Sequence, residues 1–142
     1  MPTNTVVLKK GYKPLKKEQY MCQNHLAYFR QKLTKWRAEL VDESRETINN
    51  LQQEVRDVGD EAERATRETE NSLELRTRDR YRKLINKIDK AMINLDEGDY
   101  GYCEETGEKI GLARLEARPI ATLCLDAQER WELRQRQLGD AR

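Results

Sequence analysis

The fold is decided by residues 38–95, AELVDESRETINNLQQEVRDVGDEAERATRETENSLELRTRDRYRKLINKIDKAMINL. In this stretch, and in the residues just before it, apolar side chains recur at steps of three and four, which places them on one face of a helix. The first such series is Leu26, Phe29, Leu33, Trp36, Leu40, Ser44, Ile48, Leu51 and Val55. The second is Leu73, Thr77, Tyr81, Leu84, Ile88, Met92 and Leu95, widened by Leu75, Ile85 and Ala91. The pattern predicts two long amphipathic helices.

The link between the two helices is short and polar. No Gly or Pro occurs from Gln23 to Asp57, so the first helix is expected to be roughly 45 Å long at about 1.5 Å per residue. Gly59 ends it, and Asp60 is a good N-cap for the returning helix. A parallel coiled coil between two chains is the alternative, but it would run straight through this break. The sequence therefore predicts an antiparallel coiled-coil hairpin.

The acidic residues at the predicted tip have two interpretations. Asp60, Glu61, Glu63 and Glu68 lie where a helix begins, and the helix dipole favours negative charge there. Helix-start chemistry therefore accounts for them on composition alone. The second interpretation is that the tip presents Asp60 and Glu63 to a partner.

Composition agrees with extended helices. Of the 142 residues, 37% are charged and 6% are aromatic, and the mean hydropathy is −1.01, which is too polar for a large globular core. Lys and Arg (27) nearly balance Asp and Glu (26), so no net field favours nucleic acid. The apolar runs are too short for a membrane span, and the N-terminus lacks the apolar core of a secretory signal. We expect a cytoplasmic protein that does not enter a membrane.

The residues after Leu95 follow a different pattern. DEGDYGYCEETGEKIG predicts a tight β-hairpin with turns at Gly98 and at Thr106–Gly107. A short helical stretch broken by Pro119 follows, and a final amphipathic helix is expected from Leu125 or Asp126, with Asp126 as N-cap, to about Leu138, where Gly139 stops it. The expected core of this region is Tyr100, Tyr102, Ile110, Leu112, Leu115 and Leu123, and the last helix carries Trp131, Leu133 and Leu138.

Two of the three cysteines are placed like the leading residues of zinc knuckles. A zinc ribbon repeats C-x-x-C, but the third positions after Cys103 and Cys124 are Thr106 and Ala127. Two thiolates do not fill a four-coordinate site, so we expect a zinc-finger-like shape without zinc.

A different metal site remains open. Cys22 and His25, at the start of the first helix, would join Cys103 and Cys124 in a Cys₃His set. The simpler expectation is that His25 lies on the helix surface.

Three segments together resemble the DksA family of bacterial transcription factors: GYKP (11–14), SLELRTRDRYRKLINKID (72–89) and GDYGYCEETGEKIGLARLEARPIATLC (98–124). The resemblance implies a mostly α fold, in which a long antiparallel coiled-coil hairpin protrudes from a small base with a zinc-finger-like module and a C-terminal helix. It divides the chain into an N-terminal segment packing at the base (1–22), the hairpin (23–97, tip near 57–66), the degenerate module (98–125) and the C-terminal helix (126–142).

The resemblance also implies a function. Proteins of this family bind RNA polymerase through its secondary channel and modulate initiation, for example at ribosomal RNA and amino-acid promoters, together with ppGpp in the stringent response. It implies a monomer that is not an enzyme, that binds no specific DNA and that holds no tightly bound cofactor. One alternative is a Gre-like factor whose acidic tip stimulates transcript cleavage. Another is a purely structural coiled-coil adaptor.

The family's tip motif, D-x-x-D-x-A, can be carried onto this chain. Aligned without a gap, it falls on Asp60, Glu63 and Ala65, with Glu63 in place of the second Asp. Glu keeps the charge but is one methylene longer. A second alignment, Asp57–Asp60–Ala62, keeps both aspartates but needs a gap of three residues. The resemblance thus implies that Asp60, Glu63 and Ala65 approach the polymerase active centre.

Further positions correspond to family contacts with polymerase and ppGpp. These are Arg80, Leu84 and Lys87 on the second helix. Guanidinium and ammonium groups pair well with phosphates. On pattern alone, however, Arg80 and Lys87 are ordinary solvated charges and Leu84 is a residue of the helix seam.

Arg118, within LEARP, matches another position on the ppGpp side. Without the resemblance it would simply pair with Glu116 or Asp126. A Lys that the family carries just after the last cysteine position is Gln128 here, which removes one cation from the same region.

Overall fold

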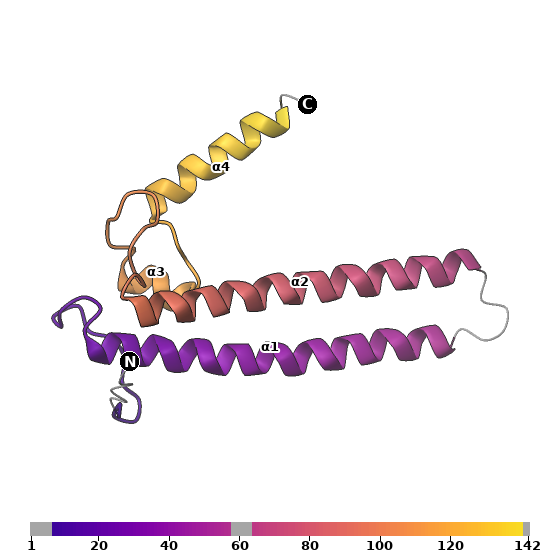
Figure 1. Cartoon of the computed structure of the whole chain (residues 1–142), viewed down its shortest axis with the longest axis horizontal. Coiled ribbons are helices and arrows are strands. Elements are labelled where there is room, and N and C mark those ends of the chain that lie inside the picture. Colours follow the sequence, from indigo (N-terminus) through magenta and orange to yellow (C-terminus); the bar gives the residue numbers. More distant parts are fainter. Residues whose placement is uncertain (1–6, 58–63, 141–142) are drawn as a thin grey trace. The chain divides into compact units, whose positions relative to one another are not determined.

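The structure is a computed structural model and describes residues 7–57 and 64–140. The described residues form four helices: α1 (Gln23–Asp57), α2 (Arg64–Glu97), α3 (Leu112–Ala117) and α4 (Leu125–Asp140) (Figure 1). The mostly α fold, with two long helices packed together, confirms the predicted class. The chain divides into two compact units, residues 34–90 and residues 1–33 together with 91–142.

In the unit of residues 34–90, α1 and α2 run antiparallel. Arg37 Nε donates to Asp89 Oδ1 (2.7 Å), the Tyr81 hydroxyl to Glu43 Oε1 (3.0 Å) and Gln52 Nε2 to Glu74 Oε1 (3.1 Å). As the residue number rises along α1, the residue number of its partner on α2 falls, so the two helices are antiparallel. The predicted hairpin direction is therefore confirmed for the described residues.

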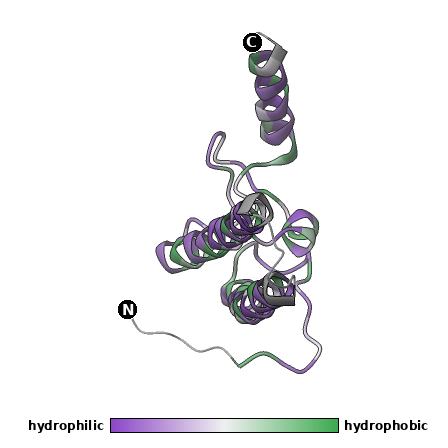
Figure 2. Ribbon diagram, turned by 90° about the vertical axis from the view of Figure 1, so that its right-hand side faces the viewer, coloured by the Kyte–Doolittle hydropathy of each residue, from purple (hydrophilic) through white to green (hydrophobic). Residues whose placement is uncertain are grey.

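The periodic series predicts most of the buried seam in this unit. Leu40 on α1 and Thr77, Tyr81 and Ile88 on α2 are buried, and the steps of four and seven between the α2 residues keep these on one face. Two residues depart from the prediction: Leu73 is 40% exposed and Leu75 is 68% exposed. Leu75 lies two positions from the buried Thr77, on another side of the helix, so it does not widen the seam. The ribbons in Figure 2 carry much purple, in keeping with a narrow apolar face.

The unit of residues 1–33 and 91–142 has a tighter core. Phe29, Leu33 and Leu115 are fully buried, and the rings of Phe29 and Tyr100 lie 5.5 Å apart between centroids. The Tyr100 hydroxyl donates to the Pro119 carbonyl (2.8 Å), as a buried phenol requires. Short loops are held on this core by such side-chain hydrogen bonds rather than by a sheet.

The predicted β-hairpin is wrong in extent. Within residues 7–57 and 64–140 there is no strand, and the segment contains one isolated antiparallel bridge, Tyr102 with Lys109. Flanking it, Cys103 N–H donates to the Glu108 carbonyl (2.7 Å) and Ile110 N–H to the Gly101 carbonyl (2.9 Å). The glycine-rich turns leave no room for a longer ladder. Tyr102, predicted in the core, is 37% exposed.

Helix α4 begins where it was predicted to begin, but its N-cap and its C-terminal end differ from the prediction. It begins at Leu125, and the Cys124 carbonyl accepts the Gln128 N–H (2.9 Å), so Asp126 lies in the first turn rather than at the N-cap. The helix passes through Gly139 and ends at Asp140. One helical Gly costs only about 1 kcal/mol relative to Ala, so Gly139 does not end the helix.

The N-terminal residues form turns before α1. Tyr12 N–H donates to the Lys9 carbonyl (3.0 Å) and Glu18 N–H to the Leu15 carbonyl (3.2 Å). The Tyr12 ring meets the Tyr28 ring edge-on, with centroids 6.2 Å apart. None of the helices in the described ranges has the length and apolar character needed to cross a membrane.

Candidate functional site

One face of α2 carries the first group of expected contact residues. Arg80, Leu84 and Lys87 follow one another at steps of four and three, so they share one side of the helix. Arg80 and Lys87 are exposed and Leu84 is half-buried. Among the described residues, neither charged group is engaged in an ion pair, and the Arg80 guanidinium lies 5.5 Å from the centre of the Tyr81 ring. This face, which we call the Arg80 face, offers two cations to a partner.

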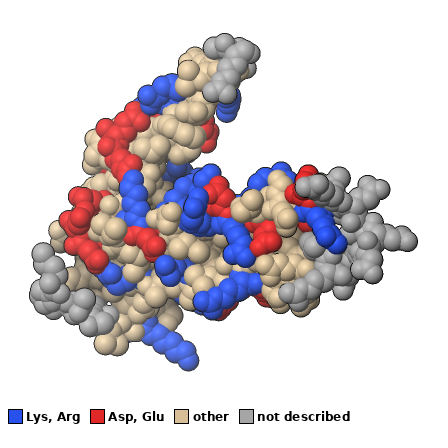
Figure 3. All heavy atoms as spheres, turned by 45° about the vertical axis from the view of Figure 1, so that its right-hand side comes forward, with Lys and Arg blue, Asp and Glu red and all other residues tan. Residues whose placement is uncertain are grey.

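Other charges of α2 are already paired. Asp79 Oδ2 lies 2.9 Å from Lys83 Nζ, and Arg82 also pairs with Asp79. These bonds lower the pKa of Asp79, chiefly through the bond from Lys83. Figure 3 shows Lys and Arg interspersed with Asp and Glu over its visible face. The Arg80 face is therefore distinguished by the absence of acidic partners rather than by a dense positive patch.

Arg118 belongs to the other unit and directly follows α3. Its N–H donates to the Arg114 carbonyl (2.8 Å) and its carbonyl accepts the Ala121 N–H (3.0 Å). Arg114 Nε in turn donates to the Leu123 carbonyl (3.0 Å). Arg118 is exposed. The expected pairing with Glu116 is wrong, because Glu116 Oε1 instead binds Lys32 Nζ at 2.7 Å.

The expected tip residues are only partly described. Asp60 and Glu63 lie outside the described residues. Ala65 lies at the start of α2, one residue after Arg64. Of the second alignment, Asp57 is the last residue of α1 and Ala62 lies outside the described residues. The tip assignment stays a prediction.

The zinc-knuckle positions gather in the module but do not fit a zinc ion. Cys103 and Cys124 are buried, and the Thr106 hydroxyl lies 3.8 Å from Cys124 Sγ. Ala127 is fully buried and offers no ligand atom. Structural zinc takes four N or S ligands in nearly every case, and this set supplies two. The donor set therefore does not suit a structural zinc.

Hydrogen bonds surround the Cys103 thiol. Burial acts to raise its pKa, but hydrogen bonds from the Thr106 hydroxyl and from the backbone of Cys124, Thr106 and Glu105 outweigh this effect and lower the pKa to about 6. A thiolate at Cys103 is thus stabilised by the protein itself.

The third cysteine belongs to another cluster. Among the described residues, the His, Cys, Asp and Glu side chains close enough to share a metal ion are Glu18, Cys22 and His25, without Cys103 or Cys124. The Cys₃His hypothesis is therefore wrong. The expected surface position of His25 is wrong as well, because its side chain is fully buried.

Two family profiles match consecutive parts of this chain. The profile described as DnaK suppressor protein DksA, N-terminal domain, matches residues 25–95. The profile described as prokaryotic dksA/traR C4-type zinc finger matches residues 98–132. The chain belongs to the DksA family. Its zinc-finger segment nevertheless has two cysteines in place of four.

Individual relatives match over most of their length. The chain is 56% identical over 137 residues to the RNA polymerase-binding transcription factor DksA of Caulobacter vibrioides, covering 96% of both proteins. It is 47% identical to that of Escherichia coli strain K12, covering 86% of this chain and 81% of the relative. The structure of transcription factor DksA2 from Pseudomonas aeruginosa aligns with a TM-score of 0.72 at 44% identity, covering 82% and 90%. These matches give the Gre-like alternative no support.

Sequence reasoning missed two residues that organise the base. The Tyr20 hydroxyl donates to the Gly101 carbonyl (2.6 Å) and accepts the Gly111 N–H (3.0 Å). Glu18 is the acceptor of the N-terminal turns. Both act across loops with no periodicity, and the partners of Tyr20 lie 81 and 91 positions away in sequence. No local pattern identifies such contacts.

Proposed function

We propose that this chain is a bacterial transcription regulator that binds RNA polymerase and modulates initiation. The observation that carries the proposal is the match, over 96% of both proteins, to a relative named as an RNA polymerase-binding transcription factor. A match across nearly the whole chain includes the two long helices and the module together. The action is an equilibrium effect, in which a bound protein changes the relative free energies of promoter complexes.

The Arg80 face is the proposed contact with polymerase and ppGpp. Arg80 and Lys87 are exposed and have no acidic partner among the described residues, so they need not break an ion pair to bind phosphate. Arg118 is proposed as a further cation on the ppGpp side. Guanidinium groups hold phosphate through two parallel hydrogen bonds, and ammonium groups act as point charges. Leu84 supplies the apolar part of the contact.

The tip is proposed to enter the secondary channel of polymerase. Asp60, Glu63 and Ala65 would then approach the active centre and alter initiation at ribosomal RNA and amino-acid promoters in the stringent response. The tip performs no catalysis in this proposal. The protein acts as a cytoplasmic monomer without specific contacts to DNA.

The zinc-finger-like module is proposed to work without zinc. Only Cys103 and Cys124 remain of the four ligand positions, and the hydrogen bonds that lower the pKa of Cys103 stabilise its thiolate in place of a metal. The segments 1–22, 23–97, 98–125 and 126–142 are proposed as the functional divisions. In that scheme 1–22 and 98–125 form the base, 23–97 the hairpin and 126–142 the C-terminal helix.

Transcription in vitro tests the Arg80 face. A ribosomal RNA promoter is transcribed with and without ppGpp, in the presence of wild type, Arg80→Ala or Lys87→Ala. The matched control is Arg82→Ala, which removes an exposed cation from another side of the same helix, where Arg82 is paired with Asp79. We expect Arg80→Ala and Lys87→Ala to lose most of the inhibition and Arg82→Ala to keep it. Equal loss in all three would contradict the assignment.

A second set of variants separates binding from effect. Asp60→Asn and Glu63→Ala are expected to bind polymerase as wild type does but to inhibit less. Binding is measured by competition with labelled wild type. Tip variants that inhibit as wild type does would contradict the tip assignment. A wild type that neither binds polymerase nor inhibits would contradict the proposed function.

A further inference from the structure

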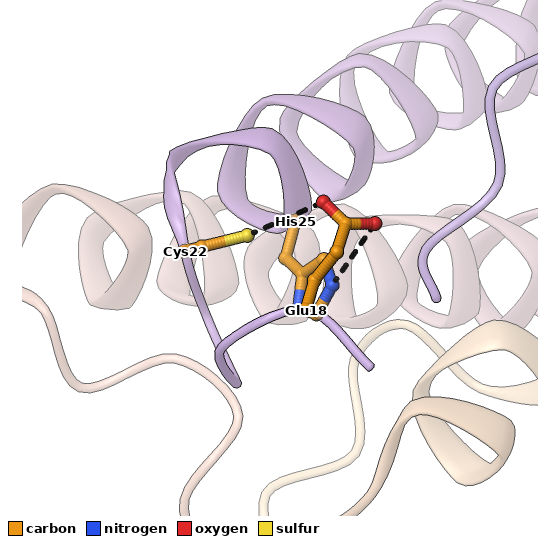
Figure 4. A group of neighbouring side chains, drawn as sticks. All are labelled: Glu18, Cys22 and His25. Carbon is orange, nitrogen blue, oxygen red and sulfur yellow. Dashed lines mark hydrogen bonds and ion pairs between the residues drawn. The ribbon is translucent and has the colours of Figure 1, made fainter. Parts of the chain in front are cut away.

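A cluster of three different metal-ligand types lies where α1 begins. Glu18 comes from the turn before the helix, Cys22 directly precedes it and His25 lies in its first turn. One carboxylate oxygen, the thiol sulfur and one imidazole nitrogen all lie within 4.8 Å of one another. Figure 4 shows the three side chains together, with dashed lines that join the Glu18 carboxylate to Cys22 and to His25. We call this group the Glu18 cluster.

His25 is the unsatisfied member of the cluster. Its side chain is fully buried, and its Nδ1 accepts the Met21 N–H at 3.2 Å. Its Nε2 is buried with no hydrogen-bond partner among the described residues, and the nearest charged atom, Glu18 Oε1, is 3.9 Å away. Burying a polar atom without a hydrogen-bond partner is unfavourable. A ligand that bound Nε2 would remove that cost.

Hydrogen bonds from the preceding turns hold Glu18 in place. The Tyr12 hydroxyl donates to Glu18 Oε1 (2.6 Å), and so does the Leu15 N–H (3.2 Å). These two bonds fix the orientation of the Glu18 carboxylate. Carboxylates that bind metals are characteristically fixed by such secondary hydrogen bonds.

We propose that Glu18, Cys22 and His25 bind one divalent transition-metal ion of the zinc type, with water as the fourth ligand. Zinc bonds of about 2.0–2.3 Å place tetrahedral ligand atoms roughly 3.3–3.8 Å apart. Cys22 Sγ already lies 3.8 Å from Glu18 Oε2, and His25 Nε2 lies 3.9 Å from Glu18 Oε1. Small side-chain movements complete the geometry. Cys22 is half-buried, which leaves a path for the ion.

Binding exchanges protons for the metal without any redox change. Because Met21 N–H donates to Nδ1, the neutral ring carries its proton on Nε2. Coordination moves this proton to Nδ1 and separates Met21 N–H from the ring. The Cys22 thiol releases its own proton and binds as thiolate. One proton is therefore released for each metal ion bound.

Met21 connects the cluster to the zinc-finger-like module. Its φ is 55°, a region that costs a non-glycine residue free energy, and its side chain covers Gly101. A Cβ on Gly101 would lie 2.9 Å from the Met21 Cγ. The peptide that must move when the metal binds is thus the strained one that packs against the module.

Cobalt binding to the full-length apo protein in a reducing buffer tests the proposal. We expect wild type to bind one Co²⁺ per chain, with a thiolate-to-cobalt charge-transfer band and tetrahedral d–d bands. Cys22→Ser is expected to lose the charge-transfer band. Glu18→Gln is expected to bind at least about tenfold more weakly. The matched control is the double variant Cys103→Ser/Cys124→Ser, which is expected to bind as wild type does.

The outcomes distinguish this site from the module and from misfolding. A band that survives Cys22→Ser and disappears in the double variant would overturn the proposal and place the metal at the module. Absence of stoichiometric binding to a wild type of normal helicity would overturn it as well. Cys22→Ser changes a half-buried atom, so its unfolding midpoint without metal should match that of wild type. Added Zn²⁺ should raise the unfolding midpoint of wild type and leave that of Cys22→Ser unchanged.

Calorimetry in two buffers of different ionisation enthalpy measures the proton count. The expected value is about one proton released per zinc ion. A value of zero would contradict thiolate coordination. This inference concerns the base alone and holds whether or not the chain binds polymerase.

Discussion

The unit of residues 34–90 and the unit of residues 1–33 and 91–142 obtain their stability from different sources. The first buries a single stripe, in which Leu40, Thr77, Tyr81 and Ile88 are the residues least exposed to solvent. The second encloses fully buried side chains such as Phe29 and joins distant segments through the hydroxyl groups of Tyr20 and Tyr100. A periodic seam is therefore enough to stabilise the two long helices of residues 34–90, which we call the helical unit. Residues 1–33 and 91–142, which we call the irregular unit, depend on individual contacts.

The largest expected effect is the loss of the Phe29 ring from the irregular unit. Phe29 is fully buried and its ring lies against those of Tyr28 and Tyr100. Phe29→Ala removes a large side chain from a closed core and is expected to cost about 3–5 kcal/mol of unfolding free energy. Denaturant unfolding followed by circular dichroism measures this loss.

Leu75→Ala is the matched control in the helical unit. Leu75 is 68% exposed, so its truncation should change the unfolding free energy by less than about 0.5 kcal/mol. A comparable loss in both variants would show that the seam is wider than the described contacts indicate.

The next effect comes from the hydroxyl that joins distant segments. Tyr20→Phe removes the bonds to the Gly101 carbonyl and from the Gly111 N–H and leaves a backbone donor without its partner. We expect a cost of about 1–3 kcal/mol in unfolding free energy. Tyr102→Phe is the control, because the Tyr102 ring packs edge-on against Tyr20 but its hydroxyl makes no hydrogen bond to another described residue. If Tyr20→Phe left the unfolding free energy unchanged, the dependence of the irregular unit on individual contacts would be contradicted.

Loss of a hydroxyl group from the seam of residues 34–90 should lower the unfolding free energy less than loss of the Tyr20 hydroxyl does. The Tyr81 hydroxyl donates to Glu43 Oε1 (3.0 Å), and Glu43 is exposed. In Tyr81→Phe water can replace the lost partner, so the expected cost is about 0.5–1.5 kcal/mol. The measurement is the same denaturant titration. A loss larger than that of Tyr20→Phe would reverse the comparison between the two units.

The sequence predicted the helical unit well because its pattern is local. Thr77, Tyr81, Leu84 and Ile88 recur at helical spacing, and that spacing alone determines which side is buried. The failure at Leu75 follows from treating any apolar residue near the stripe as part of it. The Arg80 face was available only through the family resemblance, because exposed cations on a helix have no distinctive pattern.

The irregular unit was predicted less well because its contacts are long-range. The short bridge of Tyr102 and Lys109 replaced a hairpin, since the glycines in this segment favour turns over strand pairing. His25 was expected on the surface, and its burial depends on the turn that contains Glu18 and Met21. The spacing E-x₃-C-x₂-H around Cys22 was the available signal for that cluster, but two of its members precede the helix.

The smallest effect compares one exposed ion pair from each unit. Lys32 Nζ lies 2.7 Å from Glu116 Oε1 in the irregular unit, and Arg37 Nε lies 2.7 Å from Asp89 Oδ1 in the helical unit. Because these side chains are largely exposed, Lys32→Met and Arg37→Met are each expected to cost about 0.2–1 kcal/mol in unfolding free energy. Lys32→Met should cost more, since Lys32 also donates to the Glu116 carbonyl (3.0 Å).

The pH dependence of Lys32→Met sharpens this last comparison. Burial acts to raise the pKa of Glu116, but hydrogen bonds from Lys32 and Tyr28 outweigh it and lower the pKa. A lowered pKa in the folded state means that the stabilisation is present above the unfolded pKa, about 4.3, and is lost as the pH falls through the folded value. The difference between wild type and Lys32→Met should therefore be largest near neutral pH and shrink below about pH 4. A difference that stays constant on acidification would show that Lys32 stabilises the fold through its packing on Tyr28 rather than through Glu116.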